Sequence, residues 1–292
     1  MATLRELKGR IGSVASSEKI TGAMKMISSA KMHKAEMSLK KLLPYRNLIE
    51  GIIGNLIDSD AEFTSPLTQE REVRRITIVV FGSDDGLCGA YNVNVYKELI
   101  VRMAELRKLY GADLRFTLMP VGAKIAKAVK RLAGNEVEIK PSGVNSKTAG
   151  DDVRAFLETL HNAYISGDTD RIDVLYMHFH SVSRQRPVQE QLIPVVASTF
   201  ASEGVERSSR PFLFEPSPAA IFVSVIPMFL LAVMQEVFTE NRASEQAARV
   251  MAMQSANDNA KKLLESLQLE FNKLRQQSIT TELLDIVGGQ TR

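Results

Sequence analysis

The residues best suited to chemistry lie in a glycine-rich stretch, GSDDGLCGAYN (82–92). The stretch follows the β-branched run ITIVVF (76–81) and precedes a helical pattern, which is where doubly wound sheets hold phosphate groups. It fits neither the dinucleotide-binding pattern nor the Walker pattern, and no Lys follows its glycines. Asp84 and Asp85 could ligate Mg²⁺, but no second acidic cluster with a matching strand-end placement is evident. We therefore interpret the stretch as a structural turn.

Two histidines in the stretch LYMHFHSV alternate along a pattern typical of a strand. His178 and His180 would therefore share one face, and two histidines at that spacing can begin a metal site. No cysteine lies near them in the sequence, and no third ligand can be named. Cys88 would need a base partner to act as a nucleophile, and the sequence does not indicate one. We predict no catalytic residue, no cofactor-binding residue and no metal site.

These residues belong to a segment in which strand and helix patterns alternate. The strand-like runs are ITIVVF (76–81), LRFTLMPV (114–121), EVEIK (136–140) and two runs around 172–182 and 188–196. The helical patterns between them cover about 92–110, AKIAKAVKRLAG (123–134) and DDVRAFLETLHNAYISG (151–167). Such alternation predicts a mostly parallel sheet with crossover helices. We expect an α/β Rossmann-like insert domain over residues 71–200.

Residues 1–58 are predicted to form a long N-terminal helix. Thr3 and Glu6 have the spacing of a capping box. The next apolar residues recur at steps of three and four, the rhythm of a coiled-coil seam: Leu4, Leu7, Ile11 and Val14. A later apolar set lies roughly opposite to the first: Ile20, Ala23, Met24, Ile27 and Ala30. The helix is therefore expected to meet different neighbours at its two ends.

A second long helix is predicted over residues 212–287. The region has no Gly before Gly288, and Ser217 with Pro218 suits a helix start. Pro227 predicts either a kink or a helix that becomes regular only after it. One apolar stripe follows along the helix: Ala256, Ala260, Leu263, Leu267, Phe271 and Leu274.

The base of this second helix is an apolar run, Ala219 to Met234, of 16 residues that include Ser224 and Pro227. A membrane span needs about 20 apolar residues, and the flanking residues, Glu215 and Glu236, are acidic. The run therefore predicts a buried or partner-covered helix rather than a span.

Together the patterns predict an α/β insert domain plus a long antiparallel two-helix coiled coil formed by the N- and C-terminal helices, because the insert returns the chain to its starting end. Composition is ordinary for a soluble protein of 292 residues, with 45% hydrophobic and 24% charged residues. The single cysteine fits a reducing compartment. The first 50 residues hold ten Lys or Arg and only four Glu. Such an arm is either a solvated helix face or a surface for an acidic partner, protein or nucleic acid.

Four segments in this order resemble the gamma subunit of the F-type rotary ATP synthases. They are KITGAMKMISSAKMHKAE (19–36), SDDGLCGAYN (83–92), ENRASEQAARVMAM (240–253) and NKLRQQSITTELLDIVGG (272–289). The resemblance spans nearly the whole chain. It implies a central rotor shaft of a bacterial, proton-translocating enzyme, itself non-catalytic and without a cofactor, whose terminal helices enter a hexamer of three alpha and three beta subunits.

The resemblance also implies partners for particular residues. Met24, Lys25, Arg249, Gln276 and Thr280 would contact beta subunits, which present an acidic loop to the basic arm. Phe212, Phe214 and Glu215 would contact the ring of c subunits and the epsilon subunit. The chain would lie on the cytoplasmic face of the plasma (inner) membrane as a peripheral protein, held through the c ring.

The chain departs from the family pattern at two places. Asp85 stands where the family more often has Arg, which puts the local ion pairing in doubt. The run 219–234 is more apolar than in the family, and we hypothesise that the insert domain or the epsilon subunit covers it.

Two other functions remain open from the residues alone. An α/β nucleotide-binding enzyme with a helical oligomerisation arm would use the glycine-rich stretch after the first strand. A basic coiled-coil protein that binds nucleic acid would use the N-terminal arm, although that arm lacks interleaved aromatic residues.

Overall fold

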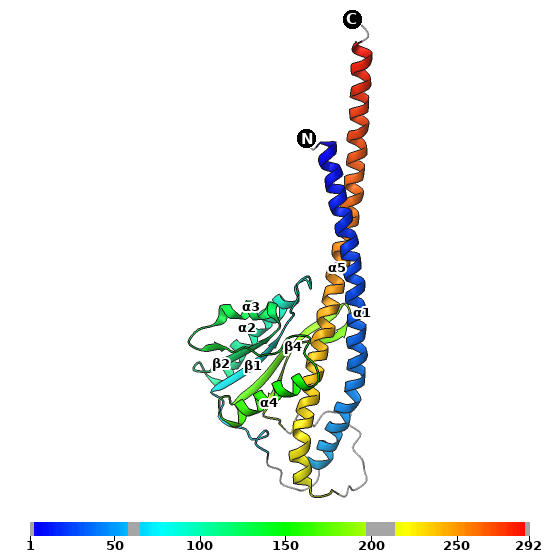
Figure 1. Ribbon diagram of the computed structural model, residues 1–292. Helices are drawn as coiled ribbons and strands as arrows, with labels where there is room; N and C mark the ends of the chain where they lie inside the picture. Colours follow the sequence, from blue (N-terminus) through cyan, green and yellow to red (C-terminus); the bar gives the residue numbers. More distant parts are fainter. Residues whose placement is uncertain (1–2, 58–64, 197–213, 290–292) are drawn as a thin grey trace.

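Two long helices form the ends of the chain and lie side by side beside an α/β domain (Figure 1). The computed structural model describes residues 3–57, 65–196 and 214–289. Helix α1 (Leu4–Ile57) has 54 residues and helix α5 (Pro218–Gly289) has 72. The predicted C-terminal range, 212–287, starts before the helix, because residues 214–217 are not helical.

Both helix starts follow from local capping. The backbone N–H of Thr3 donates to Glu6 Oε2 at 2.8 Å, and the N–H of Glu6 donates to Thr3 Oγ1 at 3.2 Å. This reciprocal pair confirms the predicted capping box. At α5, Ser217 Oγ accepts the N–H of Ala220 at 3.3 Å, and the helix begins at the predicted Pro218.

Helix α5 runs through Pro227 without interruption. The expectation that its regular part begins only after Pro227 is therefore wrong. A proline inside a helix removes one backbone hydrogen bond, but its neighbours Ile226 and Phe229 are buried in the core. Tertiary packing holds the helix together at this position.

The insert domain contains a five-stranded sheet with the order β3-β2-β1-β4-β5. Strands β1 (Arg75–Phe81), β2 (Arg115–Val121), β3 (Val137–Ile139) and β4 (Arg171–Ser181) pair in parallel, and β5 (Arg184–Ile193) is antiparallel to β4. The crossover segments contain α2 (Tyr91–Tyr110), α3 (Ala123–Val129), the 3₁₀ turn η1 (Lys130–Leu132) and α4 (Asp151–Ile165). The prediction of a mostly parallel sheet with crossover helices is confirmed.

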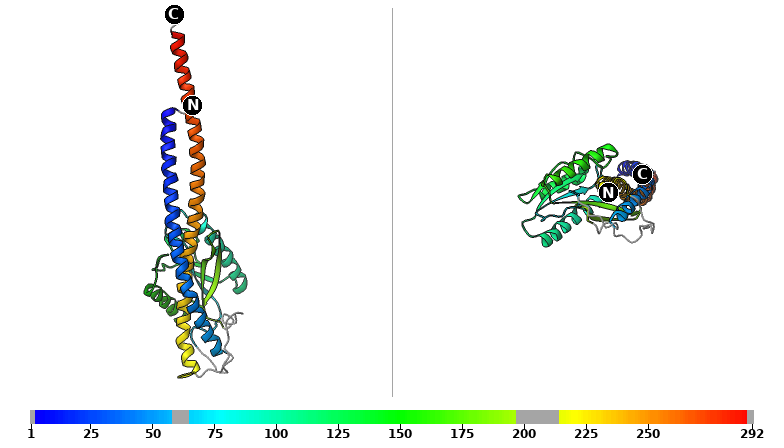
Figure 2. Two further views of the ribbon diagram at one scale, coloured as in Figure 1. Left: turned by 90° about the vertical axis from the view of Figure 1, so that its right-hand side faces the viewer. Right: turned by 90° about the horizontal axis from the view of Figure 1, so that it is seen from below.

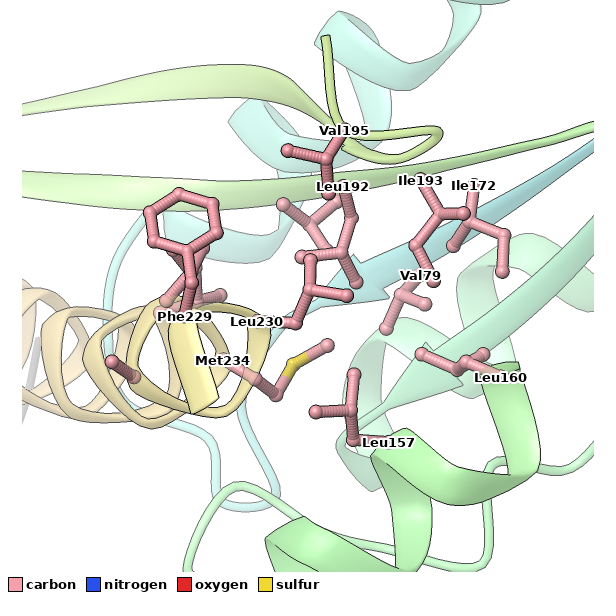
Figure 3. Close-up of a cluster of buried hydrophobic side chains, with 14 of the residues drawn as sticks. Val79, Leu157, Leu160, Ile172, Leu192, Ile193, Val195, Phe229, Leu230 and Met234 are labelled. Atoms are coloured by element: carbon pink, nitrogen blue, oxygen red, sulfur yellow. The ribbon is translucent and has the colours of Figure 1, made fainter. Parts of the chain in front are cut away.

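Each face of the sheet has its own hydrophobic core. Helices α2 and α3 cover one face, and α4 and the lower part of α5 cover the other. On this second face, Leu230 and Met234 of α5 pack with Val79, Leu157 and other core side chains (Figure 3). The insert domain therefore covers one side of the run 219–234, while Val223 and Met228 on its other side are exposed. By length and composition alone, α5 could cross a membrane, but much of its apolar segment is already buried against the sheet.

The helices α1 and α5 run antiparallel. Near the start of α1, Asn257 Nδ2 of α5 donates to the carbonyl of Glu18 at 2.7 Å. Near its end, Arg46 Nη1 of α1 forms an ion pair with Glu236 Oε2 of α5 at 2.7 Å. Figure 2 shows the pair from a second direction, with α5 extending beyond the first residue of α1.

Most buried and half-buried side chains of α1 follow one continuous seam with steps of three and four. The seam consists of Leu4, Leu7, Ile11, Val14, Glu18, Thr21, Lys25, Ser28, Met32, Ala35, Leu39, Leu42, Arg46, Ile49, Ile53 and Leu56, and a few further half-buried residues, Met24 among them, flank it. The second apolar set predicted for this helix lies mostly outside the seam, and Ile20 and Ile27 are exposed. The seam continues instead through polar and small residues.

Candidate functional site

The glycine-rich stretch forms a tight loop whose first aspartate is used internally. Asp84 Oδ1 accepts the backbone N–H of Ala123 at 3.0 Å, and Asp84 Oδ2 accepts Ser146 N–H and Oγ–H at 3.0 and 2.7 Å. Asp84 therefore links the loops that follow β1, β2 and β3 at the C-terminal edge of the sheet. Asp85 is exposed and pairs with Lys147 at 3.4 Å, a type of surface pair that contributes little to stability. These contacts support the interpretation of a structural turn.

Cys88 is buried under this loop. Its Sγ lies 3.6 Å from Ser83 Oγ and 3.5 Å from Asn92 Nδ2. Neither neighbour is a general base, so these contacts do not activate a nucleophile. Across the described ranges, no group of three or more His, Cys, Asp or Glu is arranged to hold a metal ion.

The crevice at which doubly wound sheets bind ligands is filled by α5. In this sheet the strand order reverses between β1 and β4, so that crevice lies beyond their carboxyl ends. There the fully buried Asn241 accepts the Tyr91 hydroxyl at 2.6 Å and donates to the carbonyl of Gly82 at 3.1 Å. Ser244 Oγ donates to the carbonyl of Met177 at 2.8 Å. In this chain α5 therefore occupies the position at which a nucleotide-binding enzyme of this fold would bind its ligand.

The two strand histidines share one face, as predicted, and both are exposed, and His178 contacts α5. His178 Nδ1 lies 2.9 Å from Glu240 Oε2. Burial raises the pKa of Glu240 to about 7; His178 lowers it in part, while the nearby carboxylates of Glu236 and Glu190 raise it further. Because Arg46 pairs with Glu236 at 2.7 Å, this cluster joins α1, α5 and the β4–β5 hairpin.

The raised pKa of Glu240 predicts a pH-dependent stability. A carboxyl whose pKa is higher in the folded state favours folding while it is protonated, and this contribution is lost as pH rises from about 4.5 to about 7. Glu240→Gln should match the native chain near pH 5 and exceed its free energy of unfolding by about 1–3 kcal/mol near pH 8. Urea unfolding at four pH values would measure this, with the exposed Glu265→Gln as control. A difference that stays constant with pH would contradict the prediction.

Arg249 lies inside the protein and is only 5% exposed. Its Nη2 pairs with Glu245 Oε1 at 2.7 Å and donates to the carbonyl of Asp85 at 3.3 Å, and its Nε donates to the carbonyl of Gly86 at 3.2 Å. The guanidinium therefore ties α5 to the glycine-rich loop.

A groove of about 540 Å³ lies where α1, α5 and this loop meet. More cationic than acidic side chains line the groove. The acidic ones are Asp85 and Glu245, and the cationic ones are Lys31, Lys34, Lys147, Arg242 and Arg249. Arg242 donates to the backbone carbonyls of Ser146 and Thr148 at 3.4 and 2.9 Å, and burial lowers its pKa. The groove is therefore a positively charged surface at the junction of the helices and the insert domain.

The structure brings only some of the predicted contact residues together. Met24 and Arg249 both line the groove, whereas Lys25 lies half-buried in the α1 seam. Gln276 and Thr280 are exposed one turn apart near the far end of α5, where Thr280 Oγ1 donates to the carbonyl of Gln276 at 2.9 Å.

The predicted contact residues at the base are separate from both places. Phe214 is half-buried against the core, and Glu215 is exposed. Phe212 lies outside the described residues. The sequence reasoning missed the groove residues Lys31, Lys34 and Arg242, although the spacing of the two lysines places them on one helix face.

Fold and site together define a stalk protein: two long antiparallel helices carry an α/β domain whose usual ligand position is filled by one of those helices. The family model for ATP synthase (ATP-synt) matches residues 3–291. The ATP synthase gamma chain of Bacteroides thetaiotaomicron is 39% identical and that of Phocaeicola vulgatus 40% identical, each aligned over 99% of both chains. The chain belongs to the ATP synthase gamma chain family.

A solved structure shows the same fold. The chain resembles one from a Euglena gracilis mitochondrial ATP synthase containing OSCP, F1 and the c-ring, with a TM-score of 0.66 and 19% sequence identity. The match covers 99% of this chain and 93% of that one. At this identity the match supports the fold, while the bacterial relatives establish the family.

Proposed function

We propose that the chain is the central rotor shaft of a proton-translocating F-type ATP synthase. It couples ion flow through a membrane ring to ATP synthesis at the beta-subunit catalytic sites, and it regulates the ATPase activity there, without catalysing a reaction itself. The observation that carries this proposal is the family match over nearly the whole chain. Coupling requires contacts that differ among conformers of the surrounding subunits, and a single asymmetric stalk supplies them.

The two terminal helices are proposed to form an antiparallel coiled coil. The seam of α1 described above has the steps of a heptad repeat. On α5 one row of less exposed positions has the same steps: Val250, Met253, Asn257, Ala260, Leu264, Leu267, Phe271, Leu274 and Ser278. Matching repeats on two antiparallel helices support interlocked packing.

The free end of α5 is proposed to enter a hexamer of three alpha and three beta subunits. Beyond the start of α1 it exposes apolar side chains, which a surrounding ring would cover: Ile279, Leu283, Leu284 and Ile286. Gln276 and Thr280 would make polar contacts to beta there. Met24 and Lys25 would lie near an acidic beta loop, and the cationic groove beside Met24 supplies the complementary charge.

The opposite end of the stalk is proposed to meet the c ring and the epsilon subunit, through Phe212, Phe214 and Glu215. The chain would then lie on the cytoplasmic face of the bacterial plasma (inner) membrane as a peripheral protein, with the c ring as its only link to the lipid and with no nucleic acid partner.

Co-purification of the tagged chain from its native membranes tests the proposal. We expect an ATP-hydrolysing complex that contains alpha, beta, epsilon and c subunits. Recovery of the chain alone would contradict the rotor function. Titration of the isolated chain with ATP and Mg²⁺ in a calorimeter tests the alternative of a nucleotide-binding enzyme. Saturable binding would support that alternative.

The contacts at the tip predict a coupling defect. Gln276→Ala combined with Thr280→Ala should leave assembly intact and lower ATP-driven proton pumping about 3- to 10-fold, because one or two polar contacts contribute about 1 kcal/mol each. Pumping into inverted membrane vesicles, divided by the hydrolysis rate, measures it. Gln268→Ala, an exposed site lower on α5, is the matched control. If the double variant and Gln268→Ala pump equally well, Gln276 and Thr280 do not contribute to the interface.

A further inference from the structure

Leu87, in the glycine-rich loop, has an unusual backbone conformation. Its φ is 64°, in the left-handed region that disfavours residues other than glycine. Its side chain is nevertheless large and apolar, and the residue is 58% exposed. A strained residue persists only where the surrounding structure holds it, so the loop must be braced from outside.

Part of this support comes from α5. Arg249 donates to the carbonyls of Asp85 and Gly86, the two residues before Leu87. Ser83 Oγ also donates to the carbonyl of Asp85 at 2.8 Å, and Cys88 is buried on the other side of Leu87. These contacts fix the backbone on both sides of Leu87 and leave its side chain outside.

The position of Leu87 suits contact with a partner. It lines the cationic groove together with Lys31, Lys34 and Lys147. An apolar side chain surrounded by cations complements an acidic, amphipathic segment. Arg249 itself cannot make that contact easily, because its side chain is only 6% exposed and its charge is already paired with Glu245.

We propose that Arg249 is a positioning residue, which holds Leu87 outward as the apolar contact for an acidic amphipathic segment of the surrounding catalytic ring. The proposal rests on the rotor function proposed above. It replaces the expectation that Arg249 contacts a beta subunit directly.

The first test removes the apolar side chain of Leu87 without adding strain to the loop. Gly and Asn both accept a left-handed backbone, so the Leu87→Gly and Leu87→Asn chains should fold and assemble. We expect the protons pumped per ATP hydrolysed by the membrane complex to fall at least five-fold in both. Leu87→Met keeps an apolar side chain and should retain more than half of the native value. Leu109→Asn, at an exposed leucine of α2, should match the native complex. Native coupling in Leu87→Gly would overturn the proposal.

The second test separates positioning from direct contact. In the complex, Arg249→Ala should raise amide hydrogen exchange at residues 85–88 at least ten-fold and lower coupling in step, whereas Arg249→Lys should restore part of both. Lost coupling with unchanged exchange at 85–88 would show that Arg249 acts by direct contact and would overturn the positioning role. The native chain serves as the reference: if it does not enter an ATP-hydrolysing complex, the rotor function itself fails. If it does and Leu87→Gly couples normally, only the present proposal fails.

Discussion

Replacing Phe238 with Ala is expected to lower the free energy of unfolding by about 3–5 kcal/mol, the usual cost of removing a buried aromatic ring. Phe238 is 1% exposed and lies where α5 packs on the sheet. Its ring meets Phe81 edge-on at 4.8 Å between centroids and Phe156 at 6.3 Å. The substitution therefore leaves a cavity between the helix and the insert domain and removes two aromatic contacts.

Urea unfolding followed by circular dichroism measures this loss. Met228→Ala, on an exposed side of the same helix, is the control and should cost less than about 1 kcal/mol. An equally small loss for Phe238→Ala would mean that α5 and the insert domain do not share a core.

Replacing Asn241 with Leu is expected to destabilise the chain by about 1–3 kcal/mol, because the Gly82 carbonyl then loses its buried side-chain donor. The Gly82 carbonyl loses the amide group that donates at 3.1 Å. The Tyr91 hydroxyl loses the amide oxygen that accepts it at 2.6 Å but keeps the backbone carbonyl of residue 241, which accepts it at 3.1 Å. Leu has as many side-chain heavy atoms as Asn, but its two methyl groups are bulkier than the amide, so packing strain adds to the loss.

Thermal and urea unfolding of the purified chain measure this effect. Asn272→Leu, at an exposed position farther along α5, makes the same chemical change without burial and should be nearly neutral. If the two variants have the same stability, Asn241 does not anchor the helix to the sheet.

The sequence predicted β1, β2 and β4 well because these strands are mostly apolar runs between turn and helix patterns. The largely polar strand β5 (Arg184–Ile193) begins before the predicted run around 188–196. The sequence also predicted the capping box at Thr3 and Glu6, since both partners lie within one helical turn. The middle of the α1 seam could not be predicted from apolar periodicity. There the seam consists of Glu18, Thr21 and other polar or small residues, and Asn257 of α5 reaches across to the carbonyl of Glu18. A helix contact made by a hydrogen bond from a side chain to a backbone carbonyl produces no apolar periodicity in the sequence.

The candidate site was predictable only in part. Family resemblance selected Arg249, which lines the groove together with Met24. That the guanidinium lies inside, bonded to the loop, depends on how α5 crosses the sheet, and spacing along one helix contains no such information. The conformation of Leu87 is equally invisible in the sequence, because leucine ordinarily avoids a positive φ.

The helix that fills the crevice between β1 and β4 acts as a ligand that the domain always carries. Since this ligand is covalently part of the chain, its effective concentration at the crevice is high and does not depend on dilution. A diffusing ligand would leave and return, and each departure would uncouple the domain from the stalk. A tethered one remains in place, so a force applied to the domain is transmitted to the helices without waiting for a binding event.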